Sequence, residues 1–498
     1  MPGYLPKPPM SDSQQKLLEQ VVDAFSVSDK QLSTVLYQMH SELAKNDTWF
    51  QSESQATDAT LIKRHNSPHG TALGMAIDAS GKRIRISSTS FGNSNGDKQI
   101  SESSAIQVFI PPANVKNSVS DFFEFVAFCI SEFINAHGLV DNDKTGSGAM
   151  LLPLGVSIGL PISTQNYQPS AQGACSPHTP LSCTVAEVSK EDSLDLGDRD
   201  VARHLHDTVL RNHLPIRIAS ITNNVVSSLI AAQFNNSTTR VAASFNHGIN
   251  AAYLKRCPDN QTKGMADTDQ SQRADDGYVA VNTEIGRFGS APASLAVLPM
   301  TMWDNRIDRE SRNPGTRRFE KLVADQYLGE IVRNLITDFM DEHLLFTANC
   351  DVSKVNESYS FHTAYMAPIM EDMSADLASV GDLFAAEFGI ATELADRQII
   401  RALCDCVAAR ASKLSGAALA ALTIKSSRST ASNQCSVALY GALFDVNHKI
   451  YNETVATMQK LIAIVSSHDD KRKAIETTVS FQPRFIDLSG AAINAASA

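Results

Sequence analysis

The stretch that most constrains how this chain can fold runs from Ile216 to Ala232, with the sequence IRIASITNNVVSSLIAA. Its first part is rich in β-branched residues and predicts a buried strand, whereas its second part repeats apolar residues at helical spacing and predicts a helix. Asn223 and Asn224 lie at the crossing from strand to helix. Functional groups gather at such crossings in α/β proteins, because backbone N–H groups and the helix dipole converge there. A simpler interpretation is that one of the two asparagines only caps the helix.

Length and composition narrow the class of protein. A chain of 498 residues is long enough for two domains with sizeable cores. Its net charge of −11 argues against a nucleic-acid or anionic-membrane partner. No apolar run approaches the roughly eighteen residues of a membrane span, and the polar, Pro-rich start lacks a signal or transit pattern. The eight cysteines are scattered, which is typical of buried thiols in a reducing compartment, so we expect a cytoplasmic protein.

Two amphipathic helices are predicted near the start of the chain. Their apolar stripes lie within residues 18–25 and 32–39, and Val22 belongs to the first stripe. Ser28 and Gln31 have the spacing of a capping box, which would begin the second helix. Both stripes are therefore expected to face a core.

A pair of strands follows at residues 71–91, joined by a tight turn between Asp78 and Gly81. An aspartate at the end of a buried strand can serve a metal–phosphate site. A plain hairpin turn is the simpler explanation of the same pattern.

The second half of the chain repeats this arrangement of strands and helices. Residues 239–254 predict a strand, a turn at His247 and Gly248, and a second strand, and a later strand is expected to stop at Glu284. Helical patterns follow at residues 319–340, where Glu330 is expected to begin a helix, and at 393–422, 452–465 and 489–496. Two similar halves suggest a cleft between them.

Four segments carry a resemblance to a known family. VNTEIGRFG, from Val281, resembles the sugar-site strand VNTEWGAFG of eukaryotic hexokinases, and FEKLVADQYLGEIVR, from Phe319, is similar to that family's second sugar-carboxylate segment. VVDAFSVSDKQL, from Val21, and LCDCVAARASKLSGAALAAL, from Leu403, match the family's first helices and its long C-terminal helix. The resemblance covers nearly the whole chain, and it points most closely to the atypical, non-catalytic hexokinase-like proteins of filamentous fungi.

This resemblance implies an α/β, two-domain actin-like ATPase fold of the ribonuclease H-like type. The two domains would close an interdomain cleft over sugar and ATP. The implied division is an N-terminal segment of helices and loop at 1–60, a small domain at 61–222 and a large domain at 223–498.

The resemblance also implies a sugar site made of carboxylates and amides, which hold hydroxyl groups rigidly. The implied sugar-binding residues are Gly159, Thr179, Asn223, Asn250, Glu284 and Glu330. Asn224 takes the position of the family's catalytic aspartate. A carboxamide cannot accept a proton at neutral pH, and loss of a positioned base costs on the order of 10² to 10⁴ in rate.

The implied nucleotide site departs from the family pattern at several points. Its positions are Asp78, Gly81, Arg85, His247, Gly248, Ser489 and Gly490. Asp78 would hold Mg²⁺ through water, and Arg85 would contact phosphate. Ser80 replaces a glycine that lets phosphate approach, and His247 replaces the phosphate-binding threonine of the second turn. The C-terminal adenosine segment is two residues shorter than in the family.

Residues typical of the family are replaced at several separate elements, while the surrounding helices are intact. This pattern predicts a protein that keeps the fold and has lost most of its kinase activity. Such a protein would bind a hexose weakly and would act with a protein partner as a sugar-responsive regulator of the carbon-starvation and extracellular protease response. The alternative is an active ATP-dependent hexose 6-phosphotransferase at the entry to glycolysis, using Mg²⁺ and ATP. A third interpretation is a scaffold that binds neither ligand.

Overall fold

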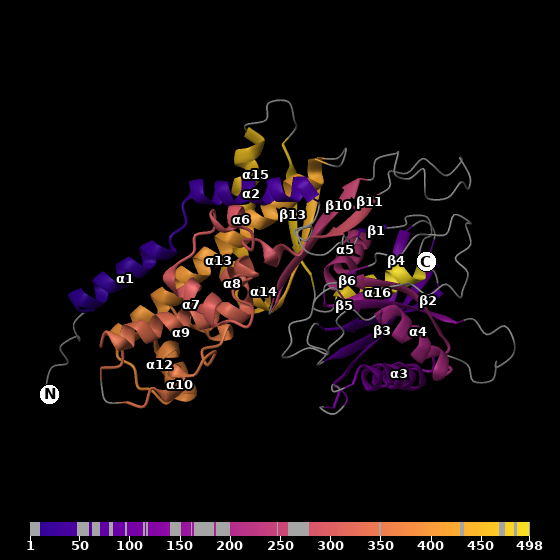
Figure 1. Ribbon diagram of the computed structural model, residues 1–498, viewed down its shortest axis with the longest axis horizontal. Coiled ribbons are helices and arrows are strands. Elements are labelled where there is room, and N and C mark those ends of the chain that lie inside the picture. Colours follow the sequence, from indigo (N-terminus) through magenta and orange to yellow (C-terminus); the bar gives the residue numbers. More distant parts are fainter. Residues whose placement is uncertain are drawn as a thin grey trace.

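The chain folds into two lobes, each built on its own β-sheet (Figure 1). The structure, a computed structural model, describes residues 10–46, 59–61, 70–78, 83–94, 97–112, 115, 118–139, 151–160, 162–163, 184–185, 200–246, 248–256, 278–347, 350–428, 433–467, 474–482 and 486–497. Both sheets are mixed and carry helices, so the protein has the α/β class predicted from its sequence.

The small lobe contains a five-stranded sheet in the order β4-β3-β2-β5-β8. Its strands are β2 (Gly70–Ile77), β3 (Ile84–Ser94), β4 (Asp97–Phe109), β5 (Leu152–Ile158) and β8 (Ile216–Asn223). Strands β2, β5 and β8 run parallel, so their carboxyl ends meet at one edge of the sheet. Helices α3 (Val119–Ala136) and α4 (Val201–Arg211) share an apolar core with this sheet.

The large lobe contains a six-stranded sheet in the order β1-β11-β10-β9-β12-β13. Its strands are β1 (Ala59–Leu61), β9 (Thr239–Phe245), β10 (Ile249–Arg256), β11 (Tyr278–Asn282), β12 (Gln434–Tyr440) and β13 (Glu476–Phe481). Strands β9 and β10 form an antiparallel hairpin, whereas β12 pairs in parallel with both β9 and β13.

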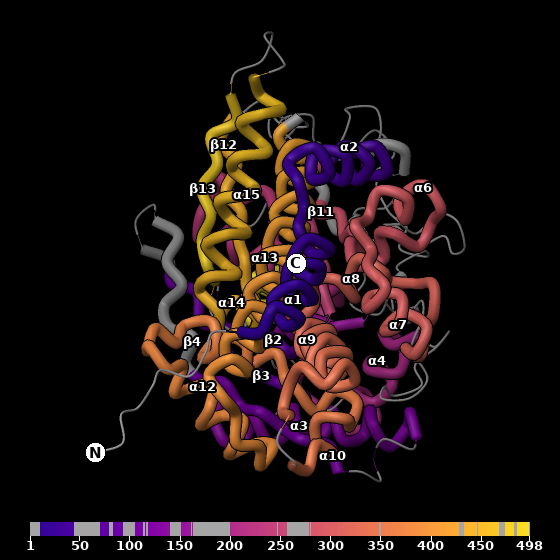
Figure 2. Tube along the Cα trace, turned by 90° about the vertical axis from the view of Figure 1, so that its left-hand side faces the viewer, coloured from indigo at the N-terminus to yellow at the C-terminus, as the bar shows by residue number. Residues whose placement is uncertain are grey.

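A large apolar core joins the helices of this lobe to one another and to the sheet. The longer helices are α1 (Asp12–Phe25), α2 (Asp29–Asn46), α7 (Met302–Glu310), α9 (Asp325–Asp341), α13 (Leu394–Arg428) and α15 (His448–Ser467). The shorter ones are α6 (Pro292–Leu295), α8 (Arg318–Val323), α10 (Ser353–Asn356), α11 (Met366–Glu371), α12 (Ala378–Leu383) and α14 (Ala442–Val446). Figure 2 shows α13 and α15 running alongside each other, with α2 crossing near one end of the pair.

One buried ion pair ties three of these helices together. Arg410 of α13 donates to both carboxylate oxygens of Asp304 in α7, at 2.6 and 2.7 Å. The guanidinium carbon of Arg410 also lies 4.2 Å from the ring centroid of Phe25 in α1. Because both charges are buried, their mutual hydrogen bonds offset part of the cost of removing them from water.

Two helices lie between the sheets and form the middle of the molecule. Helix α5 (Asn224–Asn235) packs against the large-lobe sheet, and α16 (Ile486–Ala496) packs against α5 and the small-lobe sheet. A Cβ atom on Gly490 would lie 1.7 Å from the carbonyl oxygen of Ser227, so this glycine lets α16 and α5 approach closely. The chain therefore returns to the small lobe at its C-terminal end, although the predicted division placed all residues from 223 onward in the large domain.

The structure confirms the strand and helix predicted at the central stretch, which are β8 and α5. The capping box is also present, because Ser28 and Gln31 exchange hydrogen bonds. Val22 was wrongly assigned to the core stripe, since its side chain is 39% exposed. Helix α9 begins five residues before Glu330, at Asp325, because α8 and α9 form a nearly continuous helical segment.

Helix α13 is long and apolar enough, by length and composition, to cross a membrane, but 89% of its most apolar stretch is buried inside the protein.

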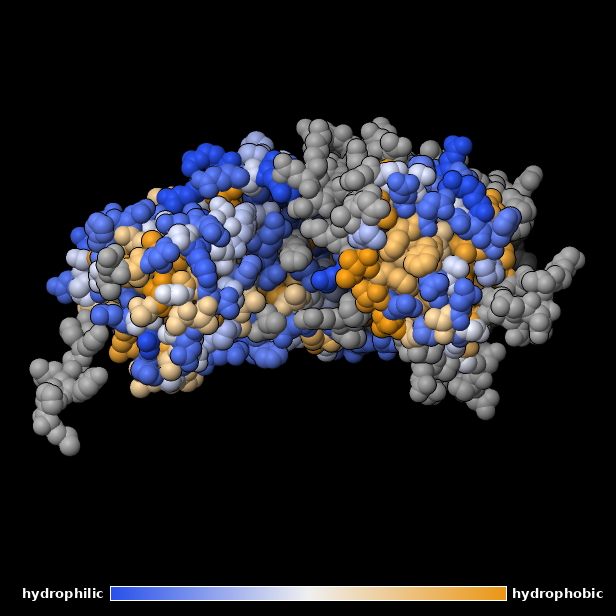
Figure 3. Space-filling view, turned by 90° about the horizontal axis from the view of Figure 1, so that it is seen from below, coloured by the Kyte–Doolittle hydropathy of each residue, from blue (hydrophilic) through white to orange (hydrophobic). Residues whose placement is uncertain are grey.

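Figure 3 shows an apolar area on the surface of the small lobe. Exposed apolar side chains of this lobe include Ile106, Val108, Ile110 and Phe128.

Candidate functional site

The candidate site begins at the shared edge formed by the carboxyl ends of β2, β5 and β8. The backbone N–H of Gly159, just after β5, donates to the carbonyl of Ile77 at 2.9 Å, next to Asp78. The side-chain Nδ2 of Asn223, at the end of β8, donates to the carbonyl of Leu160 at 3.0 Å. These bonds bring Gly159, Asp78 and Asn223 to the edge where parallel α/β sheets bind ligands.

An amide and carboxylate cluster joins this edge to the large lobe. The Nδ2 atom of Asn250, in β10, lies 2.9 Å from Asn282 Oδ1, 3.2 Å from Glu284 Oε1 and 3.4 Å from Asn223 Oδ1. Asn282, at the end of β11, also donates to Glu284 Oε1 at 3.1 Å. The structure therefore brings three of the predicted sugar-site residues together, Asn223, Asn250 and Glu284. It adds Asn282, which we did not predict, although it belongs to the same VNTE segment.

The two central asparagines have different surroundings. Asn223 is the N-cap of α5, because its Oδ1 accepts from the backbone N–H of Val225 at 3.1 Å. The capping interpretation is therefore correct for Asn223, which also belongs to the cluster. The Oδ1 atom of Asn224 accepts from the same N–H at 2.9 Å, and its carbonyl accepts from Ser228. Among the described residues, no hydrogen bond joins Asn224 to a carboxylate.

A second carboxylate at the cluster comes from Glu320 in α8, which the sequence analysis missed. Its Oε2 accepts from the backbone N–H of Ile249 at 3.1 Å. A Cβ atom on Gly248 would lie 2.8 Å from the same oxygen, so the predicted nucleotide residue Gly248 leaves space for this carboxylate. Arg317 bridges the two acids, with Nη1 3.4 Å from Glu320 and Nη2 4.0 Å from Glu284. The available signal was a pair of charged residues, Glu320 and Lys321, between the apolar residues of FEKLV.

The residues around Glu284 and Glu320 show a shifted pKa and unusual backbone conformations. Burial raises the pKa of Glu320 above its usual value, and the nearby negative charge of Glu284 adds to this effect, whereas Arg317 and the Ile249 N–H oppose it. Glu284 and Arg317 both adopt left-handed backbone conformations, with φ of 49° and 50°. Residues other than glycine adopt this conformation when their surroundings impose it, and such residues concentrate at functional sites.

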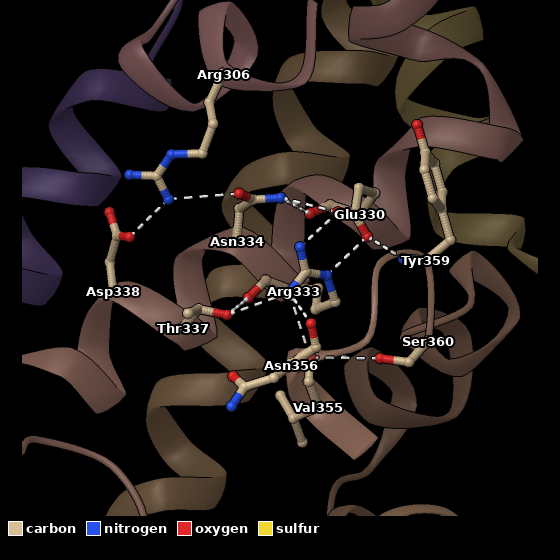
Figure 4. A network of polar contacts seen from close by, with 10 residues as sticks. All are labelled: Arg306, Glu330, Arg333, Asn334, Thr337, Asp338, Val355, Asn356, Tyr359 and Ser360. Carbon is tan, nitrogen blue, oxygen red and sulfur yellow. Dashed lines mark hydrogen bonds and ion pairs between the residues drawn. The ribbon is translucent and has the colours of Figure 1, made fainter. Parts of the chain in front are cut away.

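Glu330 lies in a different environment from the one predicted for a sugar ligand. Its carboxylate accepts from Arg333 at 2.6 and 2.8 Å, from Asn334 at 3.1 Å and from the backbone N–H of Tyr359 at 2.6 Å (Figure 4). These four bonds use the roughly four acceptor sites that a carboxylate has. The structure therefore does not join Glu330 to the cluster, because residues around α9 occupy its oxygens.

The predicted nucleotide residues are engaged within the protein. Arg85 in β3 lies 3.3 Å from the carboxylate of Asp487, at the start of α16, and Ser157 donates to the same oxygen at 3.2 Å. Ser489 and Gly490 lie inside α16, where Gly490 packs against the backbone of α5. Asp78 follows β2 directly, and its backbone N–H donates to the carbonyl of Arg83 at 3.3 Å.

Three predicted site residues fall outside the residues that the structure describes. They are Gly81, Thr179 and His247. Within the described part of the chain, no group of three or more His, Cys, Asp or Glu side chains is arranged to hold a metal ion. The described cysteines are free thiols; the predicted burial holds for Cys129, Cys404 and Cys435, whereas Cys350 and Cys406 are half-buried.

Comparison with solved structures supports the fold. A hexokinase from Schistosoma mansoni complexed with glucose matches with a TM-score of 0.74 and 21% sequence identity, over 97% of this chain and all of that chain. Another hexokinase crystal structure matches with a TM-score of 0.69 and 17% identity, over 98% of this chain. Two α/β lobes with a polar cluster where the sheets meet therefore define a protein of the two-domain sugar-kinase fold.

Comparison of sequences identifies the family. Family models described as hexokinase match residues 17–234 and 240–497. Hexokinase-2 of Saccharomyces cerevisiae is 27% identical over 422 residues, which cover 84% of this chain and 80% of that protein. The hexokinase of Kluyveromyces lactis is 26% identical over 467 residues, which cover 91% of this chain and 88% of that protein. The chain belongs to the hexokinase family.

Proposed function

We propose that this protein binds a hexose at the cluster of Asn223, Asn250, Asn282 and Glu284, with Glu320 as a second carboxylate. The observation that carries the proposal is that Asn223, Asn250, Asn282 and Glu284, at the ends of strands from both sheets, are already linked by hydrogen bonds of 2.9 to 3.4 Å. Glu320, from α8, is joined to Glu284 through Arg317. Amide groups donate to and accept from hydroxyl groups, and carboxylates accept from them. A preorganised polar site loses less conformational freedom when it binds its ligand.

We infer that phosphoryl transfer at this site is slow. Transfer to a hexose hydroxyl is faster by on the order of 10² to 10⁴ when a positioned group takes the hydroxyl proton. Asn224 has no basic atom at neutral pH, and its Oδ1 already accepts from Val225. The protein then acts in the cytoplasm as a sugar-responsive regulator, through a protein partner, in the carbon-starvation and extracellular protease response.

Members of this family generally use ATP and Mg²⁺. In this chain Arg85 is paired with Asp487, and Gly490 is packed against α5. These residues, as placed, fit a bound nucleotide poorly. Asp78 is the described carboxylate at the strand ends that could hold Mg²⁺, and a hard cation of this type can bind through one carboxylate and several waters.

An active ATP-dependent hexose 6-phosphotransferase is the second candidate, and the position of Asp78 favours it. Asp78 follows β2 directly, next to Ile77, whose carbonyl accepts from the Gly159 N–H. Phosphoryl transfer depends mainly on positioning and on metal charge, so loss of a base slows it without always abolishing it. The regulator and the enzyme share the same hexose site and differ in turnover.

Thermal unfolding with increasing glucose tests the proposed site. A ligand that binds the folded state alone raises the unfolding temperature in a saturable way. Glucose is the first hexose to test, because the similar Schistosoma mansoni structure is a glucose complex. Sorbitol at equal concentration serves as the control for non-specific stabilisation by polyols. A rise in unfolding temperature with glucose that exceeds the rise with sorbitol supports hexose binding. Equal rises with the two compounds would favour a scaffold protein that binds neither sugar nor nucleotide.

A further inference from the structure

Arg317 lies between the two carboxylates of the candidate hexose site. Its Nη1 is 3.4 Å from Glu320 Oε2, and its Nη2 is 4.0 Å from Glu284 Oε2. The side chain is 29% exposed, so it reaches the site from a partly open position. Its charge therefore acts on both acids at once.

The backbone around Arg317 holds this position firmly. The carboxylate of Asp308 accepts from the Gly315 N–H at 3.0 and 3.1 Å, from Arg318 Nε at 3.2 Å and from Lys321 Nζ at 2.6 Å. The N–H of Arg317 itself donates to Ser290 Oγ at 3.2 Å. These bonds fix the chain on both sides of Arg317 and impose its left-handed backbone.

Arg317 approaches one oxygen of each acid. On Glu284 it approaches Oε2, whereas Oε1 accepts from Asn250 and Asn282. On Glu320 it approaches Oε2, which also accepts from the backbone N–H of Ile249. A hexose hydroxyl that donates to either of these two oxygens shares it with the guanidinium.

We propose that Arg317 is a specificity-determining residue that competes with the hydroxyl groups of a neutral hexose for Glu284 and Glu320. This inference rests on the proposed hexose site. Arg317 keeps the affinity for neutral hexoses low, because its guanidinium already donates to Glu320 at 3.4 Å and lies 4.0 Å from Glu284 as a charge partner. Replacing it with an amide leaves a neutral side chain that can both donate to and accept from a sugar.

Calorimetric titration with glucose tests this role in Arg317→Gln. We expect Kd for glucose to fall about tenfold, the size of one added hydrogen bond to a charged acceptor. Arg317→Asn is the second variant, because asparagine tolerates the left-handed backbone at this position. Arg211→Gln is the control, because it removes an arginine whose ion pair is with Glu124 on the small lobe, away from the cluster. Its Kd should equal that of the wild type.

The outcomes distinguish the proposed role of Arg317 from the existence of the hexose site. Tighter glucose binding in both Arg317 variants, with Arg211→Gln unchanged, supports competition by Arg317. Equal or weaker binding in folded Arg317 variants, with measurable binding by the wild type, overturns the role of Arg317 and leaves the hexose site standing. Absence of glucose binding in the wild type and in every folded variant overturns both. Cooperative thermal unfolding of each variant without sugar establishes that it is folded.

Discussion

The guanidinium of Arg85 lies 3.3 Å from the carboxylate of Asp487, so a residue expected to contact phosphate is paired with the C-terminal helix. Ser157 donates to the same carboxylate, and the three residues join β3, β5 and α16. Asp487 is almost fully buried. The pair therefore holds α16 on the small-lobe sheet at the centre of the molecule.

Asp487→Asn should weaken the attachment of α16. Loss of one partner leaves the other charge without compensation, and we expect a loss of about 3 kcal/mol in the free energy of unfolding. Urea denaturation measures this loss. Lys460→Gln removes the exposed pair with Asp29 and should cost under about 1 kcal/mol. Similar losses in the two variants would show that the Arg85–Asp487 pair adds no more than a surface contact.

Glu284 and Glu330 should respond differently to the same substitution. Glu284→Gln should abolish the glucose-dependent rise in unfolding temperature while the folded state persists, because it removes the carboxylate that the amides of Asn250 and Asn282 hold in the cluster. Glu330→Gln should lower stability by about 3 kcal/mol, because it disrupts the buried pair with Arg333. It should keep the glucose-dependent rise. If Glu330→Gln instead removed that rise without destabilising the protein, Glu330 would belong to the sugar site.

Gly490→Ala should destabilise the junction between the lobes. The added Cβ would meet the Ser227 carbonyl at 1.7 Å, so α16 must move away from α5. We expect a loss of about 3 kcal/mol, near the upper end for an overpacked site. Asn494→Ala, at a half-buried position of the same helix, is the control and should change stability little. An unchanged unfolding temperature for Gly490→Ala would contradict the close packing of these two helices.

Stability should depend on pH through Glu320. Its pKa is raised in the folded protein, mainly by burial, from an ordinary value of 4.5. The folded protein therefore binds a proton on the Glu320 carboxylate more tightly than the unfolded protein does. The resulting contribution to the free energy of unfolding is fully present below pH 4.5. That contribution is lost as the pH rises through the folded-state pKa. Urea denaturation across this range should show a steeper fall for the wild type than for Glu320→Gln. Parallel curves would mean that Glu320 ionises with its ordinary pKa.

Local patterns in the sequence were sufficient to predict much of the fold. The strand and helix around Asn223 follow from apolar periodicity, which depends on residues a few positions apart. The Ser28 capping box follows from a local hydrogen-bond pattern as well. The prediction for Val22 failed because an apolar residue at the edge of a helical stripe can face solvent without large cost.

The site itself was only partly predictable, because its second carboxylate depends on tertiary contacts. Glu320 and Glu330 lie in the same quoted segment, and the sequence pattern does not reveal which one faces the cluster. Which glutamate faces the cluster depends on Arg333 and Tyr359, which donate to Glu330, and on Ile249, which donates to Glu320. Residues distant in the chain provide the last two contacts, so periodicity carries no information about them.

A coupled assay of ATP-dependent glucose phosphorylation, run on the wild type and on Asn224→Asp, tests the central claim most directly. With saturating glucose, Mg²⁺ and ATP, the wild type should form no product above background, because Asn224 cannot take the hydroxyl proton and Arg85 is paired with Asp487. Asn224→Asp alone should also remain inactive, because Arg85 stays paired with Asp487. Sustained turnover by the wild type, or its recovery in Asn224→Asp, would contradict this account of the site.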